Sequence, residues 1–179
     1  MILFKGNNLE ISSPNILING FYKDFGYGFY LTISKNEAIR ASLSKRGTAV
    51  LNTYKYKENL ALKILKFSKM NEEWLNFLVD CNYGKKHSYD IVEGPFPNFN
   101  IRSYFEDFLE NIITYESFLE LIKLEPPAYQ IAFCSQKSLS TLTFMGSKKL
   151  WWISIFLMKK FLLMIYILRA TWLNEFLED

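Results

Sequence analysis

The chain has 179 residues and a formal net charge of +3, and half of its residues are hydrophobic, with 17% aromatic. This composition supplies enough apolar side chains for one packed domain and excludes an intrinsically disordered chain. The basic residues are spread along the sequence without a dominant block, so the sequence does not indicate a nucleic-acid partner. The N-terminal residues lack the charged segment and long apolar stretch of a signal peptide, which predicts a cytoplasmic protein in a reducing compartment.

The sequence contains few residues that are suited to chemistry by themselves. Cys81 and Cys134 are too few for a disulfide framework or a metal site, so we expect two buried free thiols and no bound metal. The single histidine, His87, lies between polar residues and is expected on a solvated loop. The sequence motifs of serine hydrolases, zinc proteases and P-loop NTPases do not occur, which excludes these common enzyme classes.

The first part of the chain predicts two strands and a helix. Residues 2–4 form a short apolar run that is typical of a strand. In residues 24–32, two glycines precede a run that favours β-structure, which indicates a tight bend or a close approach of the backbone to another group. Ser34 and Glu37 have the spacing of a capping box, so a helix is expected from Ser34 to about Gly47.

The later elements mix strands and helices without a regular βαβ order. Apolar residues at helical spacing predict helices, and Trp74 is expected in the core. The dipeptide Gly94-Pro95 is expected to end a strand, with Asp90 and Glu93 pointing to solvent or capping the loop. The expected helices cover residues 71–80, 103–110, 114–123 and 136–142, and the expected strands cover residues 48–56, 61–67, 89–93 and 129–133. This mixture predicts an α+β fold.

The C-terminal part differs in character, so we divide the chain into a domain of residues 1–144 and an apolar, helical tail of residues 145–179. Residues 150–168 are almost wholly apolar, but Lys159 and Lys160 lie near the middle. Two central lysines cost about 5–7 kcal/mol on insertion into a bilayer. An amphipathic helix on the domain, on a partner or on a membrane surface is therefore favoured over a membrane span. A further interpretation is that the tail is not a selected sequence, for example the product of a shifted reading frame.

Five segments occur in a characteristic order, at residues 3–6, 24–32, 73–75, 89–95 and 129–133. The most specific one reads Asp-Phe-Gly-Tyr-Gly-Phe-Tyr-Leu-Thr, from Asp24 to Thr32. Together the segments resemble a bacterial family of largely uncharacterised proteins in the ADP-ribosyltransferase superfamily, whose hallmark is D-F-G-x-G-F-Y-L-T. The resemblance covers about residues 2–144 and does not include the tail.

The resemblance implies an ADP-ribosyltransferase-like split β-core with peripheral helices, which binds NAD as a cosubstrate. It implies that Tyr30 stacks on nicotinamide and that Gln130 hydrogen-bonds a ribose hydroxyl, as the two catalytic residues. Gly26 and Gly28 would let the backbone come close to NAD. The NAD-binding residues implied in this way are Lys5, Gly6, Asp24, Gly26, Gly28, Phe29 and Tyr30.

The activity implied is transfer of ADP-ribose from NAD to a protein or nucleic-acid target. The protein would be a toxin or phage-conflict effector, which implies a neutralising antitoxin as a further partner. Two residues depart from the superfamily pattern, because Lys5 stands where many members have histidine and Gln130 where many active members have glutamate. Gln130 is neutral and cannot stabilise a cationic centre by charge, so a catalytically inactive binding module is the alternative.

Two other interpretations do not depend on NAD. The tail could be the functional part, as a membrane-surface or partner-binding helix. Without the resemblance, Tyr30 is an ordinary strand aromatic and Asp24 a cap of the turn at Gly26.

Overall fold

The computed structural model describes residues 1–16, 24–96, 99–123 and 128–151, which form seven strands and five helices. The α+β class is therefore confirmed. The strands are β1 (Ile2–Asn7), β2 (Phe29–Thr32), β3 (Val50–Tyr56), β4 (Ile64–Lys66), β5 (Ile91–Phe96), β6 (Ala128–Phe133) and β7 (Leu142–Lys149). The helices are α1 (Lys35–Leu43), α2 (Glu72–Asn82), α3 (Phe99–Leu109), α4 (Tyr115–Lys123) and α5 (Gln136–Leu139). No helix within these ranges is long and apolar enough to cross a membrane. The expected tail helix lies, from residue 152 onward, outside the described residues.

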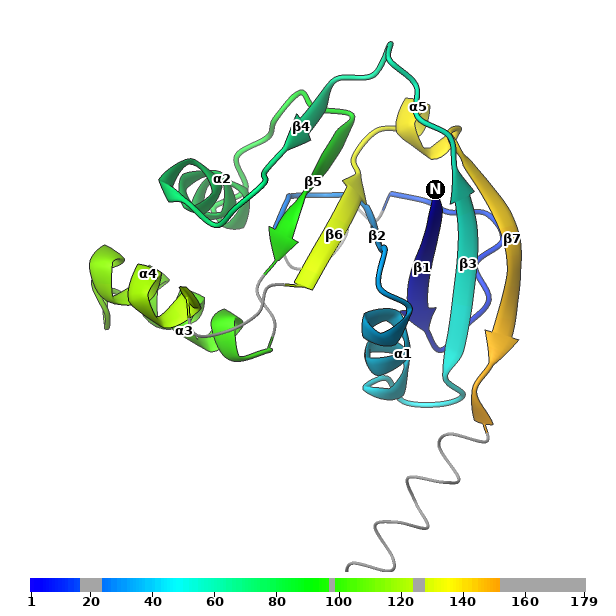
Figure 1. The fold of residues 1–179 in the computed structure, drawn as a ribbon, viewed down its shortest axis with the longest axis horizontal. Coiled ribbons are helices and arrows are strands. Elements are labelled where there is room, and N and C mark those ends of the chain that lie inside the picture. The colour runs from blue at the N-terminus through cyan, green and yellow to red at the C-terminus, as the bar shows by residue number, and fades with distance from the viewer. Residues whose placement is uncertain (17–23, 97–98, 124–127, 152–179) are drawn as a thin grey trace, which may run out of the picture.

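All seven strands belong to one sheet with the order β4-β5-β6-β2-β1-β3-β7, which is antiparallel except between β4 and β5. β1 pairs with β3 along its whole length, and β5 pairs with β6 in the same way. By contrast, β1 and β2 share a single registered pair within the described chain, Phe4 with Thr32. Figure 1 shows the β4-β5-β6 strands inclined against the β1-β3-β7 strands. The sheet thus consists of two well-paired blocks that part at the β1–β2 seam.

The two faces of the sheet are covered by different apolar clusters. Val92 and Ala132 belong to a cluster with residues of α2, α3 and α4, while Ile91 and Phe133 belong to a second cluster on the other face. This division follows from the strand geometry, in which successive side chains point to opposite faces. A third, smaller cluster joins α1 to β3 and to Leu150. Helix α1 therefore packs on the β1-β3 block, apart from the other large helices (Figure 1).

The start of α1 follows the prediction only in part. The Ser34 hydroxyl accepts a hydrogen bond from the Glu37 amide at 3.2 Å, as expected for an N-cap. In a capping box the Ser34 amide would donate to the Glu37 carboxylate. Here the Ser34 amide donates to the Thr32 hydroxyl instead, at 3.1 Å. The Glu37 carboxylate instead pairs with Arg40 at 3.1 Å. The helix also ends at Leu43, before the predicted residue 47.

The prediction that Gly94-Pro95 ends a strand is wrong, because β5 continues to Phe96. A Cβ atom at Gly94 would lie 2.9 Å from the Cβ atom of Phe67, so the strand needs glycine there for close packing. The carbonyl of Pro95 accepts a hydrogen bond from Nε1 of Trp74 at 2.8 Å. Trp74 itself is fully buried, as expected.

Glu93 and His87 are less exposed than the sequence predicts. Glu93 is 8% exposed, and its carboxylate pairs with the Lys66 ammonium at 2.6 Å. The half-buried His87 ring lies 5.2 Å from the Phe77 ring, and its Nε2 atom is 3.1 Å from the Phe25 carbonyl oxygen. These partners are distant in sequence, so a local pattern of polar residues does not reveal them.

The end of the domain also differs from the prediction. Helix α5 stops at Leu139, and Leu142 begins β7, a strand that the sequence pattern did not predict. β7 pairs with β3 from one end to the other, with a bulge between Thr53 and Tyr54. The sheet thus continues to Lys149, past residue 144 where the chain was divided.

Candidate functional site

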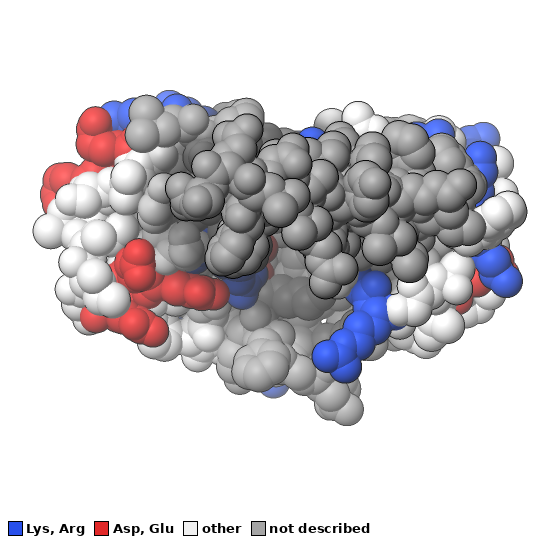
Figure 2. Space-filling model, turned by 90° about the horizontal axis from the view of Figure 1, so that it is seen from below, with Lys and Arg blue, Asp and Glu red and all other residues white. Residues whose placement is uncertain are grey.

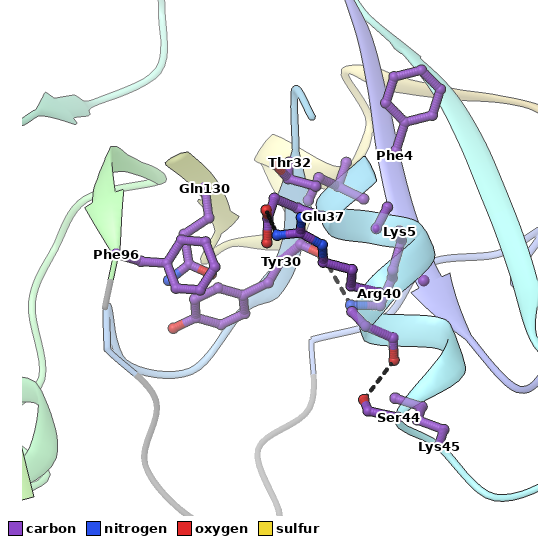
Figure 3. A pocket seen from close by; sticks show the side chains of 14 residues that line it. Phe4, Lys5, Tyr30, Thr32, Glu37, Arg40, Ser44, Lys45, Phe96 and Gln130 are labelled. Atoms are coloured by element: carbon purple, nitrogen blue, oxygen red, sulfur yellow. Dashed lines mark hydrogen bonds and ion pairs between the residues drawn. The ribbon is translucent and has the colours of Figure 1, made fainter. Parts of the chain in front are cut away.

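An open pocket of about 640 Å³ lies at the β1–β2 seam, where the two blocks of the sheet part. Residues of β1, β2, β5 and β6 line it together with helix α1. Figure 3 shows the rings of Tyr30 and Phe96 beside Gln130, while Glu37 and Arg40 reach toward them from α1. Of the residues that the sequence predicts for the site, Lys5, Gly6, Tyr30 and Gln130 line this pocket.

Lys5 lies at the seam and connects the two blocks through its side chain. Its ammonium donates a hydrogen bond to the Tyr30 carbonyl at 2.9 Å and lies 4.6 Å from the centre of the Phe29 ring. The distance to the ring permits a cation–π contact. Lys5 therefore supplies a hydrogen bond between β1 and β2 close to their single registered pair.

Tyr30 presents its ring to the pocket, while its hydroxyl is bonded to the preceding turn. The hydroxyl accepts from the Phe25 amide at 3.2 Å and donates to the Gly26 carbonyl. Burial raises the pKa of Tyr30 above its usual range, because a phenolate would lose its hydration, so the hydroxyl stays protonated. The side chain can therefore offer a ligand an aromatic surface rather than an acid or a base.

Gln130 belongs to a polar group from three segments, in which Gln130 and Asp24 are buried and Arg102 is exposed. Its Nε2 atom donates to the Asp24 carboxylate at 3.2 Å, and the Arg102 guanidinium pairs with the same carboxylate at 3.4 Å. Asp24 is 8% exposed, so its charge needs partners such as these two neighbours. The bond to Asp24 orients the Gln130 carboxamide and makes its oxygen the atom suited to accept a hydrogen bond from a ligand.

Helix α1 supplies most of the charge around the pocket. Arg40 and Lys45 line it together with Lys5, and Glu37 is the acidic residue among the described lining residues. The Lys45 ammonium donates to Oδ1 of Asn7 at 2.7 Å, which holds the end of the helix against β1. Three cations and one carboxylate give the lining an excess of positive charge. The side of the pocket that α1 forms is not among the sequence predictions, although Glu37, Arg40 and Ser44 follow the three- and four-residue spacing of one helix face.

The other predicted site residues lie around the pocket without lining it. Asp24 contacts it through Gln130, and Phe29 is buried in the cluster on the other face of the sheet. Gly26 has a positive φ of 76° and lies against His87, while a Cβ atom at Gly28 would lie 3.1 Å from the Phe133 carbonyl oxygen. These two glycines therefore serve the turn and the approach of β2 to β6.

Both cysteines line a second pocket of about 180 Å³ beside Gly26. Both are free thiols, Cys81 buried and Cys134 half-buried. Burial raises the pKa of each thiol to about 12. At neutral pH the two side chains are therefore protonated and poorly nucleophilic.

We expect both thiols to be alkylated slowly in the native protein and rapidly after unfolding. Because the pKa rises from 9.0 to about 12, the thiolate fraction at neutral pH falls by about 1,000-fold. The folded chain also keeps these protons above pH 9, where the unfolded chain loses them, so the free energy of unfolding should decrease as pH rises from about 9. Iodoacetamide labelling and urea denaturation across this pH range measure the two effects. Rapid native labelling, or stability that does not change with pH, would contradict the assignment.

One protein-family model matches most of the chain, including the pocket at the seam. The family model described as "Protein of unknown function (DUF3990)" matches residues 1–144. The chain belongs to the DUF3990 family. No curated protein and no solved structure matches it. The range matched to DUF3990 contains every residue that lines the pocket at the seam and ends inside β7.

Proposed function

We propose that this chain binds NAD at the β1–β2 seam and is an ADP-ribosyltransferase-like protein, which transfers ADP-ribose to a macromolecular target. The observation that carries the proposal is the meeting of three distant segments in one pocket. Lys5-Gly6, Tyr30 and Gln130 come from the segments in which the sequence resembles that superfamily, and all of them line the same opening. The parting of the sheet at this point also suits a split β-core.

The chemistry of the lining suits the parts of NAD. The cations Arg40 and Lys45 would attract the pyrophosphate, and the rings of Tyr30 and Phe96 offer surfaces for nicotinamide. The Gln130 carboxamide oxygen could accept a hydrogen bond from a ribose hydroxyl. These groups would hold the dinucleotide with its glycosidic bond inside the pocket.

The proposed reaction breaks the bond between nicotinamide and ribose and forms a bond from the target to the same ribose carbon. Nicotinamide leaves with the bonding electron pair, and the attacking group of the target loses a proton. Positive charge develops on the ribose during this exchange, so nearby negative charge would stabilise the transition state. Glu37 is the described carboxylate that lines the pocket, which makes it the candidate for this role.

A titration of NAD into the full-length chain tests the binding step, and an assay of nicotinamide release tests turnover. Arg40→Gln is expected to weaken NAD binding about tenfold or more, because a hydrogen bond to a charged group is lost. The Arg40 side chain is 77% exposed, so the fold should tolerate its replacement. Lys57→Gln removes an equal charge from an exposed position outside the pocket and should leave binding unchanged. A wild-type chain that neither binds NAD nor releases nicotinamide would refute the proposal.

The alternative is a catalytically inactive member of the fold that acts as a binding module. It is favoured by Gln130, which is neutral and hydrogen-bonded to Asp24. NAD binding without release of nicotinamide would support this alternative.

If the protein is active, we propose that it is a toxin or phage-conflict effector with a protein or nucleic-acid target and a neutralising antitoxin. A cytoplasmic location is part of it, in keeping with two free thiols.

A further inference from the structure

Four basic residues from two distant segments meet at one end of the sheet. Lys45 and Arg46 follow helix α1, and Lys148 and Lys149 end β7; we call these four residues the basic edge. Their proximity follows from the strand register, in which Asn7 lies opposite Val50 on β3, and Val50 lies opposite Lys149 on β7. Two interstrand spacings amount to about 10 Å. Since Lys45 is hydrogen-bonded to Asn7 at 2.7 Å, both pairs of cations occupy the same end of the sheet.

The basic edge is exposed and carries little compensating charge. All four side chains are exposed, and Arg46, Lys148 and Lys149 form no ion pair with any residue that the structure describes. Glu10 brings a carboxylate to this region, where it accepts a hydrogen bond from Ser147. An anionic surface would therefore meet an excess of positive charge here.

Acidic residues gather on the opposite side of the molecule. Figure 2 shows most of the visible acidic atoms at the left. Among the charged atoms on the right side, where β1, β3 and β7 lie in Figure 1, Lys and Arg predominate. Helices α3 and α4 and their connection carry Glu106, Asp107, Glu110, Glu116 and Glu120. This separation of charge would orient the molecule with the basic edge toward a negative surface.

The basic edge is followed directly by apolar sequence. Leu150 is buried, and its amide donates to the Ala49 carbonyl at 2.8 Å, which fixes where the chain leaves the sheet. The next residue, Trp151, is 60% exposed. It begins the apolar sequence of residues 151–168, which contains Lys159 and Lys160. Tryptophan and lysine are the residues that favour the boundary between lipid headgroups and acyl chains.

We propose that the basic edge and Trp151 dock this chain onto the surface of a membrane that contains anionic phospholipids. Lysine and arginine clusters next to apolar sequence bind phosphatidylserine and related headgroups, and the combination of charge with an apolar anchor gives stable attachment where neither alone does. A nucleic acid would also attract the basic edge, but it offers no apolar phase for the sequence that follows Trp151. Membrane docking of this kind does not depend on NAD binding.

Vesicle binding by the full-length chain tests this proposal. We expect sedimentation with vesicles of phosphatidylcholine and phosphatidylserine, and much weaker sedimentation with vesicles of phosphatidylcholine alone. Each lysine near an anionic surface contributes about fivefold to binding, so Lys148→Gln with Lys149→Gln should weaken it roughly 25-fold. These two lysines do not line the pocket at the seam, so the double variant should retain the NAD affinity of wild type.

The matched control is Lys55→Gln with Lys57→Gln, which removes the same charge near the other end of β3. Lys55 lies about 17 Å from Val50 along the strand, and both lysines are exposed. The control variant should bind anionic vesicles as wild type does. Equal loss in both double variants, or equal binding to neutral and anionic vesicles, would overturn the proposal. Binding of a short single-stranded oligonucleotide is measured for the same variants. If Lys148→Gln with Lys149→Gln weakened oligonucleotide binding but not vesicle binding, the basic edge would be a nucleic-acid surface and the proposal would be overturned.

Discussion

Trp74→Ala is expected to lower the free energy of unfolding by about 3–5 kcal/mol, the range for removing a large aromatic side chain from a core. Trp74 is fully buried on α2, in the cluster that joins α2, α3 and α4 to the sheet. Its removal would leave a cavity and would also leave the Pro95 carbonyl without its partner, the indole Nε1 atom at 2.8 Å. Urea denaturation followed by far-ultraviolet circular dichroism measures the change.

Two further variants separate the packing from the hydrogen bond. Trp74→Phe keeps an aromatic ring but lacks the donor, so it should cost less than Trp74→Ala, at about 1–3 kcal/mol. Tyr83→Ala removes an aromatic side chain that is 73% exposed at the end of the same helix, and it should change stability little. If Tyr83→Ala and Trp74→Ala were equally destabilising, the burial of Trp74 would not be the cause.

Gly6→Ala is expected to destabilise the chain by about 3 kcal/mol, at the upper end of the range for overpacking. A Cβ atom at this position would lie 1.8 Å from the Ala38 carbonyl oxygen and 2.6 Å from the Ser42 amide nitrogen. Both are backbone atoms of α1, so the whole helix would have to move. Since α1 carries Arg40 to the pocket and Lys45 follows directly after it, NAD affinity should fall together with stability.

Gly146→Ala provides the contrast, because it tests backbone strain without a clash. Gly146 has a φ of 127°, and no atom lies within 4 Å of a Cβ built there. We expect a smaller cost, of about 1–2 kcal/mol, and no change in NAD affinity. Thermal denaturation of both variants, with NAD titration of each folded protein, makes the comparison. Wild-type stability of Gly6→Ala would show that α1 is not packed against β1 as described.

The helices and all described strands before β7 carry local sequence signals and could be predicted, whereas β7 could not. Asn71 caps α2 by accepting from the Trp74 amide at 3.1 Å, at the position where the apolar stripe begins. β7 gives a weak sequence signal because its half-buried positions, Leu142, Phe144 and Gly146, include a glycine without a side chain, and because it adjoins a strongly apolar sequence. A strand of this kind is defined by its partner β3, which ends nearly 90 residues earlier, rather than by its own pattern.

Some residues of the candidate site could likewise be predicted from the sequence, and others could not. The segments around Lys5, Tyr30 and Gln130 could be named from the sequence resemblance, and the structure brings these residues to one pocket. The contribution of α1 to the pocket could not be predicted, because the spacing of Glu37 from Ser34 indicates a capping residue rather than a pocket residue. The ion pair of Asp24 with Arg102 joins residues 78 positions apart, so it depends entirely on the tertiary fold.

The sparse pairing of β1 with β2 affects how related proteins with this fold can differ in the ligands they bind. Among the described residues, one registered backbone pair and a hydrogen bond from the Lys5 side chain link β1 to β2 at the opening. The width of the opening is therefore controlled by replaceable side chains rather than by a continuous hydrogen-bonded ladder. Substitutions at this seam can alter which molecules enter while each block keeps its own register and core. Substitutions of pocket residues can therefore change ligand specificity during evolution while the fold stays the same.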